Sequence, residues 1–546
     1  EMAADALQPL NSRKWDEKKA KHLLSRAGFG IPRERVTHLA QIGLHKAVDA
    51  LVEFDSVPQY GQEPAFLLPS NQYRTLRDIE DEDERRKARQ RIQRAERQSV
   101  QLLKQWWFDR ILNSPRPLEE KMTLFWHGHF ATSAQKVKNS TANYMLHSDF
   151  RSNAVGNFKE LTIAVAKSPA MLRYLDNTQN VKEHPNENWA RELMELFTLG
   201  IGNYTEDDVK ESARAFTGWT IGRNGFYIRN RVHDEGSKTF LGHTGNLDGL
   251  DVIDIIFEQP ATAQFLSRKL YLYFVGDDID DAVIKAIASD LRTNNYDLAP
   301  TLKKLFLSKA FYSERAIGTQ IKSPVQFVAQ LVHDLDMPYP PYASMARASA
   351  QLGQDLFYPP NVKGWDGGRT WINANTLLTR YNLSTTIASA NGHKEMMQMQ
   401  KGMEAMPGMM SPEIMQQGMR KDMDAYMLTL PRHEQAKIRN RIRGFKTQQE
   451  RSRYVSRLID KSKNYEYWNA KQVFDDLTFK TAQECVDALV SRFLALPVSR
   501  DQQTLIAEAL GVVSGLSSPL KHSDLDDAKM NAALHLLLST AEYQLT

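Results

Sequence analysis

The chain has 546 residues, of which 42% are hydrophobic and 25% charged, and its 70 basic and 66 acidic side chains give a formal net charge of +4. This composition is that of an ordinary globular protein, and it excludes global disorder, collagen, a coiled-coil rod and a strongly basic nucleic-acid-binding protein. No run of eighteen apolar residues occurs, so the sequence predicts no membrane-spanning segment.

Cysteine usage bounds the chemistry further. Cys485 is the single cysteine, so an intramolecular disulfide and a zinc site built on several thiolates are excluded. It lies in an apolar run over 485–490, which predicts a buried, inert thiol. The first residues, Glu1 to Asp5, do not form a basic-then-apolar leader, so we expect no signal peptide within this sequence.

Apolar residues recur with helical spacing along most of the chain, which predicts a mainly α fold. Residues 77–97 are dense in Arg, Glu and Asp at three- and four-residue spacing, which predicts one long solvated helix that runs on into the apolar stretch 102–108. A small β-hairpin is expected over 217–221 and 226–228, around Asn224-Gly225. Further helices are expected near 15–26, 34–53, 117–127, 139–148, 153–166, 188–199, 205–217, 249–258, 261–274, 280–292, 298–307, 323–335, 433–461, 466–475, 480–495, 500–510 and 525–540.

Three segments are predicted: a main helical domain over 10–390 that carries the candidate site, a methionine-rich flexible insertion over 391–430, and a C-terminal helical region over 431–546 that packs on the main domain. Eleven of the nineteen methionines lie between 396 and 427. Thioethers select Cu(I), so a copper-handling role is one interpretation of this segment, and a flexible insertion is the other.

The first candidate for chemistry is the pair His127 and His129, separated by Gly128. Two imidazoles form a common half of a metal site, but on a regular helix positions i and i+2 point about 200° apart. We expect Gly128 to end the helix that begins near Pro117, so that the two rings can converge on one ion. The alternative is two histidines packed among aromatic side chains.

The second candidate is the predicted helix that begins after Pro185. Asn188, Glu192 and Glu195 share one of its faces, and two carboxylates one turn apart can hold a metal or divide acid and base roles. Arg191 has the spacing to pair with Glu187 or Glu195. The alternative is a solvated helix face with an ordinary ion pair.

The third candidate is His233-Asp234 with Lys238, expected on a loop after the hairpin. A loop His-Asp pair can ligate a metal or orient a base, and Lys238 could hold an anionic group. The alternative is a surface turn. The fourth is the Gly-, Pro- and Trp-rich stretch over 353–371, in which Trp365 and Trp371 could form a stacking wall for a sugar, or instead plug the core.

Several ordered strings together resemble the bacterial family called domain of unknown function 1800. The resemblance rests on the segments over 22–30, 120–130, 186–200, 217–219, 233–234, 238–242, 322–325 and 358–365, and it covers roughly residues 15–390 before it resumes near the C-terminus. It implies a largely helical, exported protein, periplasmic or secreted, often encoded beside a partner of the alkaline-phosphatase or sulfatase type. The family supplies no established reaction.

Two hypotheses follow. In the first, the protein is a metal-dependent hydrolase or oxidoreductase. Its divalent ion, Zn, Mn or Fe, is bound by His127, His129, Glu195 and His233, with Glu192 or Asp234 as general acid or base and Arg191 or Lys238 on an anionic substrate. In the second, it is a non-catalytic exported binding or assembly protein that acts with a partner on surface polysaccharide through the loop of Trp365 and Trp371 and the exposed helix over 77–97. Asn188 is the further substrate-binding candidate. An aromatic groove without clustered carboxylates would favour the second.

Overall fold

The computed structural model describes residues 6–30, 33–69, 71–337, 342–388 and 468–546, together with positions 438, 441, 442 and 454. The fold is mainly α, as predicted, with two small antiparallel two-stranded sheets in the described part. The predicted methionine-rich insertion over 391–430 and the predicted helix over 433–461 fall outside the described residues, apart from the four isolated positions.

Nearly all of the described elements are helices. Their bounds are α1 Glu17–Arg26, α2 Arg33–Ile42, α3 Leu44–Val52, α4 Glu82–Asn113, α5 Pro117–His129, α6 Ser140–Ser152, α7 Phe158–Lys167, α8 Pro169–Tyr174, α9 Asn188–Glu192, α10 Glu206–Ala215, β1 Trp219–Gly222, β2 Gly225–Ile228, β3 Lys238–Phe240, β4 His243–Gly245, α11 Gly249–Glu258, α12 Pro260–Phe274, α13 Asp281–Thr293, α14 Leu298–Leu307, α15 Pro324–Asp334, α16 Tyr342–Gln351, α17 Ala374–Ala388, α22 Lys471–Asp475, α23 Ala482–Phe493, α24 Arg500–Ala509 and α25 Asp527–Leu538.

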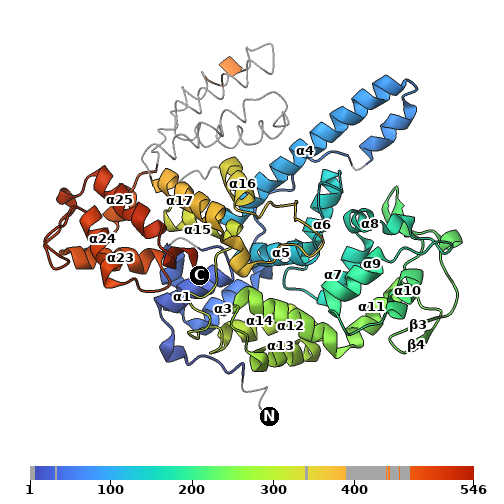
Figure 1. Cartoon of the computed structure of the whole chain (residues 1–546), viewed down its shortest axis with the longest axis horizontal. Coiled ribbons are helices and arrows are strands. Elements are labelled where there is room, and N and C mark those ends of the chain that lie inside the picture. Colours follow the sequence, from blue (N-terminus) through green and yellow to red (C-terminus); the bar gives the residue numbers. More distant parts are fainter. Residues whose placement is uncertain are drawn as a thin grey trace.

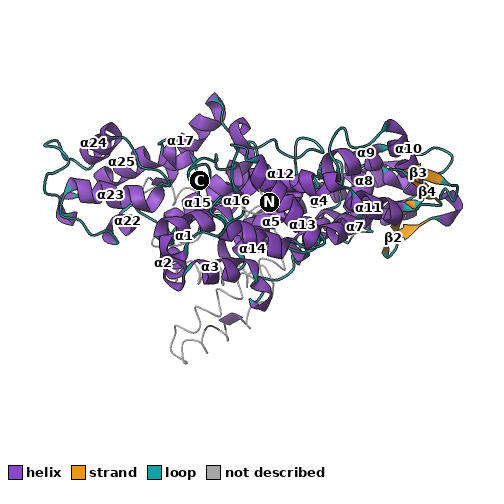
Figure 2. Cartoon of the chain, turned by 90° about the horizontal axis from the view of Figure 1, so that it is seen from below, coloured by secondary structure: helices purple, strands orange, loops and turns teal. Residues whose placement is uncertain are grey.

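The molecule is elongated in both views, with α23, α24 and α25 at one end and the strands β3 and β4 at the other (Figures 1 and 2). The long helix α4 projects from this body (Figure 1). No helix among the described residues combines the length and the apolar character needed to cross a bilayer.

Two clusters of buried apolar side chains hold the helices together. One joins α1–α3 to α5–α14, with Trp126 and Phe158 stacked near its centre. The other joins α4, α15 and α16 to the C-terminal helices, with Trp468 fully buried in it. Burial of apolar area on this scale is what makes a largely helical chain of this length stable, since isolated helices are marginal in water.

The predicted hairpin is present as β1 and β2, in which Gly222 pairs with Gly225. A second hairpin, β3 and β4, lies where the sequence suggested a loop over 232–242. Leu241 and Gly242 form its two-residue turn, and both have positive φ (45° and 84°), as a type I′ turn requires. Leu at the first of these positions is a poor turn signal, which is why the pattern did not predict the hairpin.

Helix α5 lies at the centre of the body (Figure 1), and a fully buried carboxylate on it fixes its position. Glu120 accepts hydrogen bonds from Trp107 Nε1 (3.0 Å), Arg110 Nε (2.9 Å), and Arg151 Nε and Nη2 (both 2.9 Å). Burial alone would raise the pKa of Glu120, but the two guanidinium groups hold it below its usual range. The network joins α4, α5 and α6 through one side chain.

Candidate functional site

A cleft of about 930 Å³ opens beside α5. Its walls come from α5, from the end of the helical segment over 188–198, from α12, and from the loops around 320–326 and 363–371. This volume is typical of small-ligand pockets. Six cationic side chains line it, Lys121, Arg268, Lys269, Lys322, Lys363 and Arg369, against three acidic ones, Glu195, Asp277 and Asp366.

Lys121 lies on α5 directly after Glu120, and its side chain reaches the cleft wall. It is buried, and its ammonium donates one hydrogen bond, to Gln326 Oε1 at 2.5 Å. The aromatic rings of Phe29 and Tyr273 lie 4.9 and 5.5 Å from Nζ. No carboxylate of the described residues lies within ion-pair distance of it, and burial lowers the pKa of Lys121 to about 7.

Lys269 on α12 is the second lysine of the cleft, and it is half-buried. It donates to Leu196 O (3.1 Å) and contacts His129 Nδ1 (3.3 Å), while the ring of Phe265 lies 4.9 Å away. Burial lowers the pKa of Lys269 to about 8. It too has no carboxylate partner among the described residues, only the carbonyl at a helix end, where the dipole favours a cation.

Lys322 is the third lysine that lines the cleft, and its ammonium points away from the cleft. Its ammonium lies 3.8 Å from the centroid of the Tyr543 ring, and Tyr543 is not a lining residue, so this charge lies behind the wall. Its Nζ has no hydrogen-bond partner in the described part of the chain, and burial lowers the pKa of Lys322 to about 7.

His129 lines the cleft, whereas His127 lies in the core. Contrary to the expectation that Gly128 ends the helix, α5 continues through His129. The two imidazoles therefore leave it in different directions, as i and i+2 positions must, about 200° apart. His127 Nε2 accepts from Phe357 N (3.0 Å), and His129 Nε2 contacts Phe197 O (2.9 Å).

The glycine between these histidines is a contact point for the loop that carries the tryptophans. A Cβ at Gly364 would lie 2.2 Å from the Gly128 carbonyl oxygen, and Gly364 has φ +79°, so only glycine fits there. This close approach places Trp365 against α5, and Trp365 and Trp371 both line the cleft. The two tryptophans therefore lie at one cleft, although Trp371 is also largely buried.

The helix predicted over 188–199 is in fact α9 followed by a π-helix over Leu193–Thr198. Glu195 lines the cleft and accepts from Tyr204 Oη (3.0 Å). Burial and then Glu195 raise the pKa of Glu192, which does not line the cleft. Arg191 pairs with Glu187 (3.1 Å) and Glu206 (2.8 Å), and Asn188 is exposed at the start of α9.

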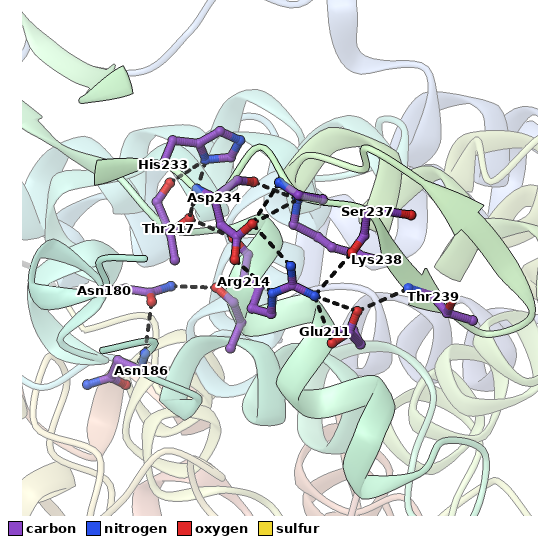
Figure 3. Close-up of polar contacts among 12 residues, drawn as sticks. Asn180, Asn186, Glu211, Arg214, Thr217, His233, Asp234, Ser237, Lys238 and Thr239 are labelled. Carbon is purple, nitrogen blue, oxygen red and sulfur yellow. Dashed lines mark hydrogen bonds and ion pairs between the residues drawn. The ribbon is translucent and has the colours of Figure 1, made fainter. Parts of the chain in front are cut away.

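His233, Asp234 and Lys238 lie in a separate polar network that ties the second hairpin to α10 (Figure 3). Arg214 donates to both Asp234 oxygens (2.7 and 3.1 Å) and to Glu211, and these bonds hold the pKa of Asp234 low. His233 Nδ1 contacts Thr217 O (2.7 Å). Lys238 Nζ donates to the carbonyls of Asp234 (2.6 Å) and Gly236 (2.9 Å). The chain itself satisfies these groups.

The structure therefore brings four of the predicted site residues to one cleft: His129, Glu195, Trp365 and Trp371. It places His127 in the core, Arg191, Glu192 and Asn188 on α9, and His233, Asp234 and Lys238 in the hairpin network. Within the described residues, no group of three or more His, Cys, Asp or Glu side chains is arranged to hold a metal ion. The structure does not bring the predicted donors together: His127 contacts Phe357 N in the core, His129 and Glu195 line the cleft, and His233 contacts Thr217 O in the hairpin network.

Sequence reasoning missed Lys121 and Lys269. A signal for Lys121 was present, because the segment 117–130 is dense in large apolar and aromatic side chains, and a lysine buried among them needs a partner or a ligand. Lys269 has no such signal, because its contacts Leu196 O and His129 Nδ1 lie 73 and 140 residues away in the chain.

A protein-family model described as "Protein of unknown function (DUF1800)" matches residues 22–545. No curated protein and no solved structure matches the chain.

Proposed function

The chain belongs to the DUF1800 family, whose description gives no function, and we propose from the cleft itself that the protein binds an acidic saccharide there. The observation that carries this proposal is the pair Lys121 and Lys269, one buried and one half-buried lysine that line the cleft without a carboxylate partner among the described residues. Buried charges in proteins are normally paired, because an unpaired one loses its hydration without compensation. An anionic ligand would supply the missing counter-charge.

The class of anion follows from the rest of the wall. Trp365 and Trp371, with Phe125, Phe265 and Tyr273, provide flat apolar surface beside the two ammonium groups. Such a combination suits a ligand with ring faces and charged substituents, and a uronic acid or sulfated sugar has both. The excess of cationic over acidic lining residues also favours the approach of an anion.

This proposal develops the second of the two hypotheses from the sequence, a protein that acts on surface polysaccharide. An exported location and a partner of the alkaline-phosphatase or sulfatase type would agree with it, and both stay predictions. The metal-dependent hydrolase or oxidoreductase also stays a prediction.

The test is isothermal titration calorimetry of the full chain with an oligosaccharide of uronic acids and with its carboxyl-reduced, neutral counterpart. We expect the acidic oligosaccharide to bind and the neutral one to bind at least about tenfold more weakly. The double variant Lys121→Met/Lys269→Met should lose at least about tenfold in affinity for the acidic oligosaccharide.

The matched control is Lys285→Met, which removes an exposed charge from α13, away from the cleft. Equal weakening in the control would mean that net charge, not the cleft, governs binding. Equal affinity for the acidic and the neutral oligosaccharide, or no binding of the acidic one, would overturn the proposal.

A further inference from the structure

A second hollow, of about 740 Å³, lies on the projecting arm of the molecule, between the 3₁₀ helix Gln72–Asp78, α4 and α8. We call it the basic hollow. Its cationic lining residues are Arg77, Arg85, Arg89, Lys138 and Arg173, and none of its lining residues is acidic. It shares no lining residue with the cleft, so the proposal below stands apart from the proposed function.

Most cationic side chains of the basic hollow make no ion pair within the described residues. Arg85 donates to the carbonyls of Ile79 (2.7 Å) and Glu80 (3.2 Å), and so fixes the entry into α4 without meeting a carboxylate. Among the described residues, the side chains of the other four cations make no ion pair. By contrast Arg86, one residue further along the same helix, pairs with Asp83 at 2.8 Å.

The walls of the basic hollow are held in place by one buried carboxylate. Glu96 accepts a hydrogen bond from Nε2 of Gln72, the first residue of the 3₁₀ helix, and another from Ser140 N (2.6 Å) at the start of α6. It thereby fixes segments on both sides of α4. Glu96 is committed to these two donors and lies in the wall of an adjoining pocket. It makes no ion pair with the cations of the hollow among the described residues, although its charge partly offsets the lowering of the Arg173 pKa by burial.

Tyr73 supplies an independent sign of a missing ligand atom. Its hydroxyl is buried and has no hydrogen-bond partner in the described part of the chain. Burial, and then the nearby charge of Glu96, raise the pKa of Tyr73, so the O–H donor is kept. A buried hydroxyl without a partner is uncommon in a folded protein. This one lines the same hollow as the four cationic side chains that make no ion pair within the described residues.

We infer that the basic hollow is a second anion site, which binds a phosphate group through Arg77, Arg89 and Arg173, with Tyr73 as a further donor. A guanidinium presents paired N–H groups that match two oxygens of a phosphate, and arginine is favoured wherever phosphate is bound in this bidentate way. A soluble phosphate compound and the headgroup of an anionic lipid offer the same oxygens, and the two arms of the test below distinguish them.

The first arm of the test is titration calorimetry of the full chain with inorganic phosphate at constant ionic strength. We expect binding that weakens at least about tenfold in Arg89→Gln/Arg173→Gln. The matched control, Arg86→Gln/Arg91→Gln, removes two exposed charges of α4 outside the hollow and should change affinity less than about twofold. All four side chains are exposed, and circular dichroism checks that each variant folds.

The second arm is co-sedimentation with vesicles of phosphatidylglycerol and of phosphatidylcholine. Capture by phosphatidylglycerol alone, lost in Arg89→Gln/Arg173→Gln, identifies the lipid headgroup. Phosphate binding without capture identifies a soluble phosphate compound. The inference is overturned if phosphate does not bind, if the control pair weakens binding as much, or if Lys121→Met/Lys269→Met abolishes phosphate binding while Arg89→Gln/Arg173→Gln does not, which would assign phosphate to the cleft.

Discussion

Lys238 in the hairpin network and Lys121 in the cleft wall are both buried, at 1% and 7% exposure. They differ in how many hydrogen-bond acceptors surround the ammonium group. Lys238 donates to two backbone carbonyls and lies 4.0 Å from an Asp234 oxygen. Lys121 donates to a single acceptor, the side-chain amide oxygen of Gln326. The first cation is part of the fold. The second cation, Lys121, keeps N–H donors without an acceptor at the wall of a cleft. This is the pattern expected where a bound ligand supplies the missing acceptors.

The strongest way to sharpen this comparison is to disturb Glu120, the satisfied neighbour of Lys121 on α5. Glu120→Gln leaves the buried guanidinium groups of Arg110 and Arg151 without a counter-charge, so we expect a loss of about 3–5 kcal/mol in the free energy of unfolding. Chemical denaturation followed by tryptophan fluorescence measures it. Glu195→Gln, which disturbs a half-buried carboxylate of the cleft, is the control; a loss below about 1 kcal/mol for Glu120→Gln would contradict the assignment.

The same substitution at the two lysines should give opposite results. Lys238→Met leaves two carbonyls without their donor and should cost about 1–3 kcal/mol in the free energy of unfolding. Lys121→Met removes a buried charge without a counter-ion and should leave the stability of the ligand-free protein unchanged or higher. Denaturation midpoints of the two variants decide it, and similar losses in both would show that Lys121 is structural.

Lys121 and Lys269 also make the free energy of unfolding of the ligand-free protein depend on pH. Burial lowers the pKa of Lys121 to about 7 and of Lys269 to about 8, whereas an unfolded lysine titrates near about 10.4. Between about pH 7 and 10 the unfolded state therefore binds more protons, and stability rises with pH, by up to about 1.4 kcal/mol per pH unit for one lysine. Melting temperatures at about pH 6 and 9 measure it. The slope should be flatter in Lys121→Met, and an unchanged slope would count against a buried, titrating Lys121.

The sequence predicted the helical architecture well, because apolar periodicity is strong in helices such as α12 and α13. It did not predict α16, whose segment is mostly small residues, Ala and Ser, with few large apolar side chains to mark a buried face. A helix of this kind is stabilised by what it packs against, here α4 and α15, and that contact is not visible in its own residues.

The candidate site was predictable only in part, for a related reason. The sequence selected polar residues such as Asp234 and Arg191, which other side chains of the fold satisfy. Arg214, 20 residues earlier, binds Asp234, and Arg191 pairs with Glu187, as its spacing allowed, and with Glu206, 15 residues on. Burial and pairing are properties of the folded chain, so a lone polar residue cannot be classified from its neighbours in sequence. Trp365 and Trp371 were selected as aromatic residues of a Gly-rich loop, and the structure places both at the cleft, with Trp371 largely buried.

The smallest expected effect concerns Arg191, the predicted anion-binding residue of α9. Its partners Glu187 and Glu206 are 38% and 68% exposed, so Arg191→Met should change the free energy of unfolding by less than about 1 kcal/mol. Because Arg191 does not line the cleft, the affinity for an acidic oligosaccharide should stay within about twofold of the unmodified protein. Glu206→Gln, which removes the other half of the pair, should behave alike in both measurements. If instead Arg191→Met abolished binding and Lys121→Met did not, the anion would be held at α9, as the sequence analysis first predicted for Arg191, and the unsatisfied donors of Lys121 would need another explanation.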